Sequence, residues 1–142
     1  MDRLQRFLDA QAPVFGQACA ELQAGCKQSH WMWFIFPQLR GLGLSATAQH
    51  YGIASRQEAL DYWLHPVLGP RLKHCMALLL AHRGLSAQAI FGSTDAMKLR
   101  SCATLFAAVA PEEPVFQQVL DQYCAGAPDG RTLTLLQQAP GF

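Results

Sequence analysis

The stretch of sequence that does most to determine the fold runs from Lys27 to Gln38 and reads KQSHWMWFIFPQ. It holds two of the three tryptophans of the chain, and polar residues stand at both of its ends. Bulky residues in succession have high β-propensity, but no partner strand is evident elsewhere, and an isolated strand would leave its backbone groups unpaired. We therefore expect Trp31–Phe36 to form a helix. Because that helix would be apolar on all sides, it should be buried at the centre of the fold.

The remainder of the chain also favours helix over sheet. Ala, Leu and Gln are abundant, whereas isoleucine occurs only at Ile35, Ile53 and Ile90. Apolar periodicity and capping residues predict helices over residues 2–10, 13–24, 55–64, 67–81, 86–91, 93–109 and 114–124, with Thr132 capping a last short helix. We expect an all-α fold: a single compact orthogonal helical domain over residues 1–142, with about seven to eight helices around the buried Trp/Phe-rich central helix.

Composition excludes several classes of function. The formal net charge is +1 and no Lys/Arg cluster occurs, which argues against a nucleic-acid partner. The longest apolar run is far shorter than the roughly 18 residues of a membrane span, and the start lacks the apolar core of a signal peptide. We expect a cytoplasmic protein with no membrane partner. Charged residues make up only 15% of the chain, which a homo-oligomeric interface would also explain.

Neither a metal nor a cofactor is predicted. The sequence has no HExxH, no paired CxxC, no dinucleotide fingerprint and no serine-hydrolase elbow. Without an export signal, the five cysteines should be reduced and act as small buried hydrophobes. Cys26, which lies beside Lys27, is the strongest candidate for a reactive thiol.

Three short groups of polar residues in this otherwise apolar chain suggest a site for a small molecule. His30, His65 and Asp95 are the candidate catalytic acid–base groups. Trp31 or Trp33 would form the floor under a planar or sugar-containing ligand. The other candidate ligand-binding residues are polar side chains in the same motifs: Lys27, Ser29, Gln38, Ser45, Tyr51, Arg71, Lys98 and Ser101.

Each of these residues also has a structural interpretation, which the sequence leaves open. The tryptophans could fill the core with their indole N–H groups on carbonyls. Ser45 could be the N-cap of a helix that follows the turn at Gly41 and Gly43, and His65 could cap the helix before it. Asp95 and Lys98, three residues apart on a helix, could simply form an ion pair.

Three segments resemble a known family. KQSHWMWFIFPQL-GLGLS, HPVLGPRL and IFG-TD-MKLRS-TLF, in this order, are similar to the domain-of-unknown-function 1810 family of small bacterial proteins, some of which carry a misleading calpastatin-like label. The resemblance runs from about Glu21 to Phe106 and more loosely to the C-terminal region. It implies a compact all-α domain and no established activity. Cys26 stands where the family more often has a basic residue, which weakens a thiol mechanism.

The resemblance also implies which polar positions recur in the family. In this chain they are Lys27, Ser29, His30, Gln38, Ser45, Tyr51, His65, Arg71, Asp95, Lys98 and Ser101. Two kinds of function fit these residues: a protein that binds or acts on a small nucleotide- or sugar-like ligand in a Trp/His-lined pocket, or a non-catalytic interaction or oligomerisation module.

Overall fold

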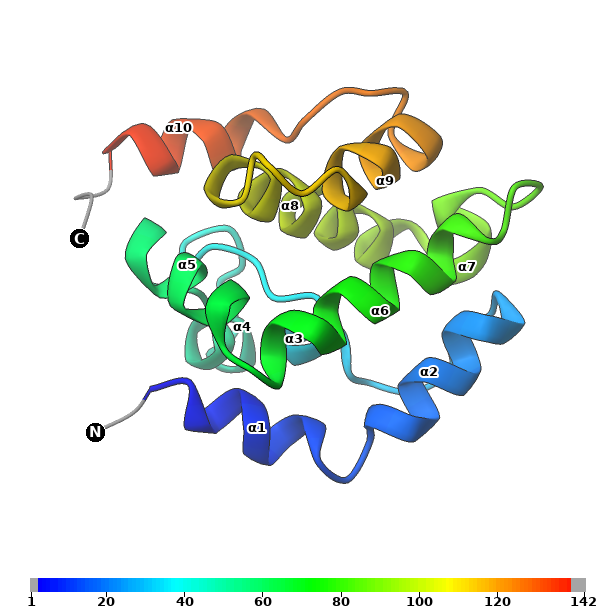
Figure 1. The fold of residues 1–142 in the computed structure, drawn as a ribbon, viewed down its shortest axis with the longest axis horizontal. Helices are drawn as coiled ribbons and strands as arrows, with labels where there is room; N and C mark the ends of the chain where they lie inside the picture. Colours follow the sequence, from blue (N-terminus) through cyan, green and yellow to red (C-terminus); the bar gives the residue numbers. More distant parts are fainter. Residues whose placement is uncertain (1–2, 139–142) are drawn as a thin grey trace.

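The structure is a computed structural model that describes residues 3–138, and within that range it contains ten helices and no strand. The helices are α1 Gln5–Gln11, α2 Phe15–Ala24, α3 Met32–Ile35, α4 Ala46–Tyr51, α5 Arg56–Leu64, α6 Leu68–Leu80, α7 Ala87–Phe91, α8 Ser93–Val109, α9 Val115–Tyr123 and α10 Gly130–Gln138 (Figure 1). The all-α prediction is confirmed. Asp2, where the first helix was expected to begin, lies outside the described residues.

The predicted count of seven to eight helices was too low. Three of the helices, α3, α4 and α7, have only 4, 6 and 5 residues. Helices this short are marginal on their own, so tertiary packing rather than local preference holds them. Residues 86–91 and the Trp31–Phe36 segment were predicted as helices, whereas α4 was considered only as a helix that Ser45 could cap.

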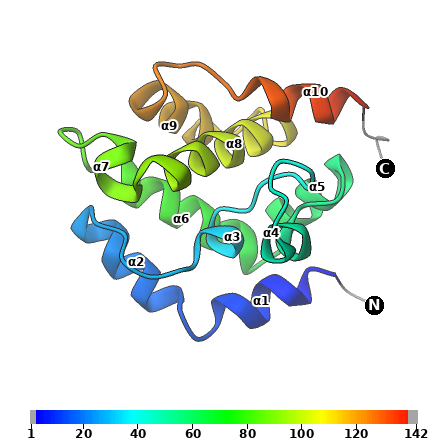
Figure 2. The ribbon, with the colours of Figure 1, turned by 180° about the vertical axis from the view of Figure 1, so that it is seen from behind.

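The helices are arranged in three tiers (Figures 1 and 2). One tier contains α1 and α2, α6 crosses the middle, and α8, α9 and α10 lie on the opposite side. Helix α8 has 17 residues and packs against α5, α7, α9 and α10. Every residue from Ser101 to Phe106 is buried. The first turns of α8, by contrast, carry partly exposed polar side chains, so this helix links the core to the surface.

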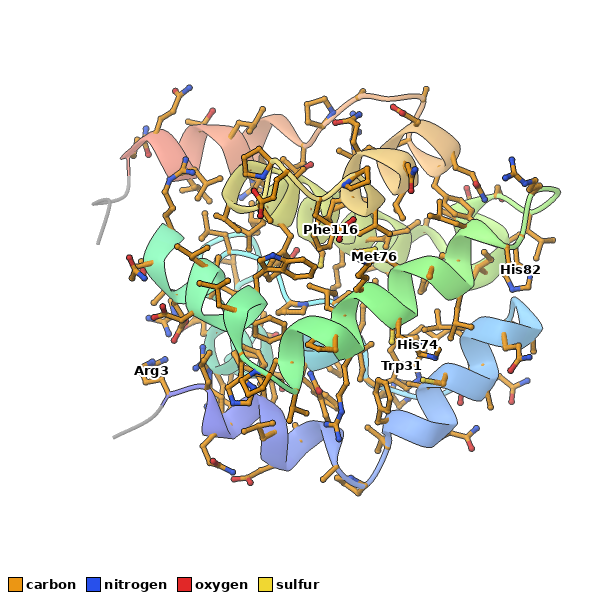
Figure 3. All side chains as sticks on the ribbon, viewed as in Figure 1. Arg3, Trp31, His74, Met76, His82 and Phe116 are labelled. Atoms are coloured by element: carbon orange, nitrogen blue, oxygen red, sulfur yellow. The ribbon has the colours of Figure 1, made fainter. Side chains whose placement is uncertain are left out.

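Aromatic side chains join the tiers in the interior. The ring of Phe106 lies 5.4 Å from that of Tyr62 and 5.6 Å from that of Phe116, measured between centroids. Met76 and Phe116 occupy the middle of the molecule, whereas Arg3 and His82 lie toward its opposite edges (Figure 3). The core is therefore built across α5, α6, α8 and α9 and does not depend on one central element.

The helix predicted over Trp31–Phe36 is present as α3, but it packs against α1 and α4 and is not the central element that was expected. A single turn spans Met32–Ile35, after which the chain becomes extended. Leu39 then forms an isolated parallel bridge with Ile53: Ile53 N donates to Gln38 O at 2.9 Å, and Arg40 N donates to Ile53 O at 2.8 Å. The partner that the sequence did not reveal lies in the loop between α4 and α5, where one Ile makes no strand pattern. The expected burial is confirmed, since Trp31 is 0% exposed.

Capping residues fix several helix starts. Ser45 caps α4 by accepting from Ala48 N at 3.1 Å, so this structural interpretation is confirmed. Ser55 accepts from Glu58 N at 3.1 Å, and the Glu58 carboxylate reaches back to Ala54 N, which gives a variant of the expected capping box.

The predicted cap of the last helix was wrong. Helix α10 begins at Gly130, and Asp129 Oδ2 accepts from Thr132 N at 2.9 Å. Thr132 itself is buried within the first turn and donates its hydroxyl to the same carboxylate. An Asp three residues before a buried Thr satisfies the N-cap geometry better than the Thr does, because an N-cap residue lies outside the helix.

Candidate functional site

The polar residues in front of Trp31 gather on the buried carboxylate of Glu21, in α2. Glu21 is 5% exposed and accepts four hydrogen bonds from this segment. The donors are Gln28 N at 2.7 Å, Ser29 N at 2.9 Å, Ser29 Oγ at 2.6 Å and the Trp31 indole Nε1 at 3.0 Å. The indole N–H of Trp31 is therefore paired with a carboxylate, not with the backbone carbonyl that sequence analysis had allowed for.

These donors control the charge of Glu21. Burial on its own would raise the pKa of this carboxyl group, but the hydrogen bonds from Ser29, Gln17 and Gln28 outweigh burial and hold the pKa well below its usual range. Glu21 is thus an ionised hub that fixes the loop between α2 and α3. We call Glu21, Ser29 and Trp31 the Glu21 hub. Sequence analysis missed Glu21, although a charged residue between Ala18 and Leu22 on the apolar face of α2 was a usable signal.

A second group of charged residues lies where this loop meets α8. Asp95 Oδ2 is 2.9 Å from Lys27 Nζ, and Asp95 Oδ1 is 3.3 Å from Lys98 Nζ. The expected pair of Asp95 and Lys98 is confirmed, and Lys27 joins it. The side chain of Lys27 is 8% exposed, and its ammonium lies 5.1 Å from the centre of the Trp31 ring. Two cations therefore share one carboxylate.

Next to this ion pair is a surface cavity of about 280 Å³, which we call the α8 cleft. It lies between the first turns of α8, the segment that follows α3, and the start of α10; Figure 2 shows that segment passing beside α8 and α10. The lining residues are Gln38, Leu42, Gly43, Thr94, Met97, Lys98, Arg100, Ser101, Asp129 and Arg131. Three of the predicted ligand-binding residues, Gln38, Lys98 and Ser101, thus meet in one cavity.

A much smaller cavity lies on the inner side of Gln38 and Lys98. Its volume is about 10 Å³, which is room for about one water molecule, and Trp33 and Tyr51 are among its lining residues. The ammonium of Lys98 lies 4.9 Å from the centre of the Trp33 ring. Trp33 and Tyr51 therefore stand behind the cleft, and Trp33 together with Asp95 holds the Lys98 ammonium in place.

The structure places His65 away from the α8 cleft. It lines a separate depression between α5 and α6, together with Trp63, Pro70 and others. Its Nδ1 accepts from Val67 N at 3.1 Å and from Leu68 N at 3.3 Å. The backbone N–H of His65 donates to Tyr62 O at 3.2 Å, so His65 is the C-cap of α5 and this structural interpretation is confirmed; its imidazole also caps the start of α6.

The remaining predicted site residues are also dispersed. Arg71 donates to Gln11 Oε1 at 3.3 Å and stacks on the Phe15 ring at 4.8 Å, next to α1 and α2. His30 is exposed in the loop before α3. Ser45 is the N-cap of α4. The three candidates for acid–base catalysis therefore lie in different places: His30 in the loop before α3, His65 in the depression between α5 and α6, and Asp95 in the ion pair beside the α8 cleft.

The cysteines do not form a reactive cluster. All five are free, and burial raises the pKa of the Cys75 and Cys102 thiols. Cys26 is exposed, and Cys19 and Cys124 are half-buried, so the expectation that each cysteine is buried holds only for Cys75 and Cys102. Within residues 3–138, no three His, Cys, Asp or Glu side chains lie close enough together to hold a metal ion. In the same part of the chain, no helix combines the length and apolar character that crossing a membrane requires.

The fold and the cleft define a small all-helical protein with a cationic surface cavity on its longest helix. The chain matches the family described as "Protein of unknown function (DUF1810)" over residues 1–136 and belongs to that family, so the family prediction is confirmed. It is also similar to a solved structure, the conserved hypothetical protein Rv1873 from Mycobacterium tuberculosis. The two are 48% identical, with a TM-score of 0.93, and the match covers 94% of this chain and 96% of the other. No curated protein matches the chain.

Proposed function

We propose that this protein binds a small polar metabolite in the α8 cleft. The observation that carries the proposal is the convergence of Gln38, Lys98 and Ser101 on one cavity, since these residues come from two segments far apart in the sequence. The cavity volume of about 280 Å³ is at the lower end of the roughly 300–1,000 Å³ typical of ligand pockets. A ligand the size of a sugar or a mononucleotide fits this volume better than a dinucleotide does.

The lining residues divide the cleft into a polar and an apolar side. Gln38 offers an amide that can both donate and accept, and Ser101, whose hydroxyl donates to Met97 O at 3.2 Å, offers its hydroxyl oxygen as an acceptor. Lys98 supplies an ammonium that is already held by Asp95 and Trp33, so little side-chain entropy remains to be lost when a ligand binds. Leu42 and Met97 form apolar surface for the carbon skeleton of the ligand.

Binding without chemistry is better supported than acid–base catalysis. Asp95 is engaged by two lysines, and the Nδ1 of His65 is engaged by the backbone of α6. A general base must reach the proton that it removes, with an oxygen or nitrogen that is free to accept it. A binding or sensing role uses the same cleft and needs no free base. Proton transfer by His30, His65 and Asp95 is therefore the less favoured form of the proposal.

A thermal-shift screen of nucleotides, sugar phosphates and amino-acid derivatives tests the proposal. A ligand at 100 times its Kd stabilises the protein by about 2.7 kcal/mol, a shift of roughly 5–10 °C in Tm for a domain of this size. We expect Lys98→Ala to remove the shift and Lys73→Ala to retain it. Lys73 is a matched control because it also forms an ion pair, with Glu113 at 2.8 Å, and lines a different depression. Equal shifts in the two variants would argue against the cleft.

An interaction or oligomerisation module is the second candidate, and exposed apolar side chains favour it. Leu44 is 85% exposed and Met97 is 71% exposed, one next to the cleft lining and the other within it. Light scattering at increasing protein concentration tests this role. We expect a concentration-dependent rise in mass that Leu44→Gln together with Met97→Gln abolishes; a constant monomer mass would contradict it.

A further inference from the structure

The α8 cleft carries more positive than negative charge. Three cationic side chains line it, Lys98, Arg100 and Arg131, against one acidic side chain, Asp129. The carboxylate of Asp129 is already engaged, because its Oδ2 accepts from Thr132 N at 2.9 Å and from Thr132 Oγ1 at 2.6 Å. These donors are neutral and leave the Asp129 charge in place, so the four charged side chains of the lining carry a net charge of +2. The cleft therefore attracts an anion from solution.

The two arginines have unused donors. Arg100 donates through Nε to Ala127 O at 2.9 Å, which orients the guanidinium group and leaves its terminal nitrogens available. The side chain of Arg131 is exposed and forms neither a hydrogen bond nor an ion pair with any residue in the range 3–138. Guanidinium groups present a planar fork of N–H donors that matches the oxygens of phosphate and carboxylate groups.

Lys98 is not neutralised by its ion pair. Asp95 shares its single negative charge between Lys98 and Lys27, so the three side chains together carry a net charge of +1. Lys98 lines both the cleft and the inner cavity, so this net positive charge lies next to a ligand bound in the cleft. A positive centre thus stands on α8, one helical turn from Ser101 and one from Thr94, both of which line the cleft.

We propose that the group recognised in the α8 cleft is the phosphate of a small phosphomonoester, held by Lys98, Arg100 and Arg131. This inference rests on the proposed function and names its ligand class. A phosphate carries about −1.5 to −2 charges at pH 7 and three acceptor oxygens, so it can engage three cationic groups at once. A carboxylate has one charge and two oxygens and would leave one of the three cations unmatched. The cleft volume of about 280 Å³ limits the ester to a sugar or a mononucleoside.

Binding measured by calorimetry with four probes at matched ionic strength tests this inference. The probes are ribose 5-phosphate, ribose, the carboxylate ribonate and inorganic phosphate. We expect ribose 5-phosphate to bind at least tenfold more tightly than ribose and ribonate, since charge-assisted hydrogen bonds are the strong ones. Inorganic phosphate should bind weakly and compete with the ester.

Arg131→Gln is the informative variant, because the side chain is exposed and its loss does not threaten the fold. It should weaken the binding of ribose 5-phosphate and inorganic phosphate about tenfold. Arg83→Gln is the matched control: Arg83 is also exposed but lines a different depression, with Gln118 and Asp121, and its loss should change neither affinity.

The outcomes separate this inference from the proposed function. A response to inorganic phosphate that Arg131→Gln removes supports phosphate recognition whichever ester is bound. Equal affinity for ribose and ribose 5-phosphate, or equal effects of the two arginine variants, overturns the phosphate inference and leaves binding in the cleft standing. If none of the four probes binds and the wider metabolite screen gives no shift that depends on Lys98, both proposals fall.

Discussion

Two groups of polar side chains flank the aromatic segment at Trp31, and they differ in how far their hydrogen-bonding capacity is used. In the Glu21 hub, the carboxylate is filled by donors from Ser29, Trp31 and the backbone of the loop. In the α8 cleft, Arg131 and the terminal nitrogens of Arg100 remain available. Buried polar groups must be satisfied within the protein, whereas a binding site keeps some unsatisfied for its ligand. Polar residues beside aromatic ones therefore indicate a site only where that capacity is left over.

The largest expected effect comes from removing the centre of the Glu21 hub. Glu21→Ala leaves the buried indole N–H of Trp31 without its acceptor, together with a hydroxyl and two backbone N–H groups that are part-buried. We expect a loss of about 3–5 kcal/mol in the free energy of unfolding, measured by urea denaturation. Glu58→Ala is a control, since Glu58 is an ionised carboxylate that pairs with Arg6 nearer the surface, and it should cost less. A loss below about 1 kcal/mol for Glu21→Ala would contradict the conclusion that the Glu21 hub serves stability while the cleft serves binding.

The two tryptophans give a more closely matched comparison. Trp31→Phe removes a donor to Glu21 and leaves a void in the core, so it should cost about 2–3 kcal/mol. Trp33 is partly exposed, and its ring faces the Lys98 ammonium. Trp33→Phe should cost less than about 1 kcal/mol and should instead weaken ligand binding in the α8 cleft. Equal costs for the two substitutions, measured by denaturation, would contradict the division between a structural and a ligand-facing tryptophan.

The smallest expected effect is on the acid side of the stability profile. The pKa values of Glu21, Glu58 and Glu113 are lowered in the folded protein. A carboxyl group with a lowered pKa stabilises the fold above its unfolded pKa, about 4.3 for Glu, and that contribution is lost as the pH falls toward the folded value. We expect the free energy of unfolding to decline below about pH 4.3.

A Glu21→Gln variant isolates the hub in this profile. Glutamine cannot ionise, so the gap in stability between the wild type and the variant should narrow by about 1 kcal/mol as the pH falls to about 2.5. The measurement is urea denaturation of both proteins at several pH values. A gap that stays constant with pH would mean that the charge of Glu21 contributes nothing.

Much of the fold could be predicted because the signals are local. Apolar periodicity placed the long helices, and Ser45 and Ser55 act as the N-caps that their positions indicate. The prediction missed the Leu39–Ile53 bridge, because its partner lies further along the chain in a loop with no strand pattern. It also missed a local signal: Asp129, three residues before Thr132, is the residue that caps α10.

The candidate site was predictable in part for the same reason. Gln38, Lys98 and Ser101 were recognised as polar residues in an apolar setting, and they meet in the α8 cleft. The sequence offers no signal for Arg131, which enters the cleft only because α10 packs against α8. The sequence also could not show that Arg71 lies outside the cleft, because its position beside Phe15 depends on how α6 packs against α2.

The sequence by itself determined that this protein is all-helical, that Trp31–Phe36 is buried, and which family the chain belongs to, because propensity, periodicity and motif order are properties of neighbouring residues. Only the tertiary structure decided which polar residues serve stability and which line a cleft. That choice depends on whether a partner lies within hydrogen-bonding distance, as Glu21 does for Ser29 and Trp31. Residues distant in the chain supply such partners, and packing alone brings them together.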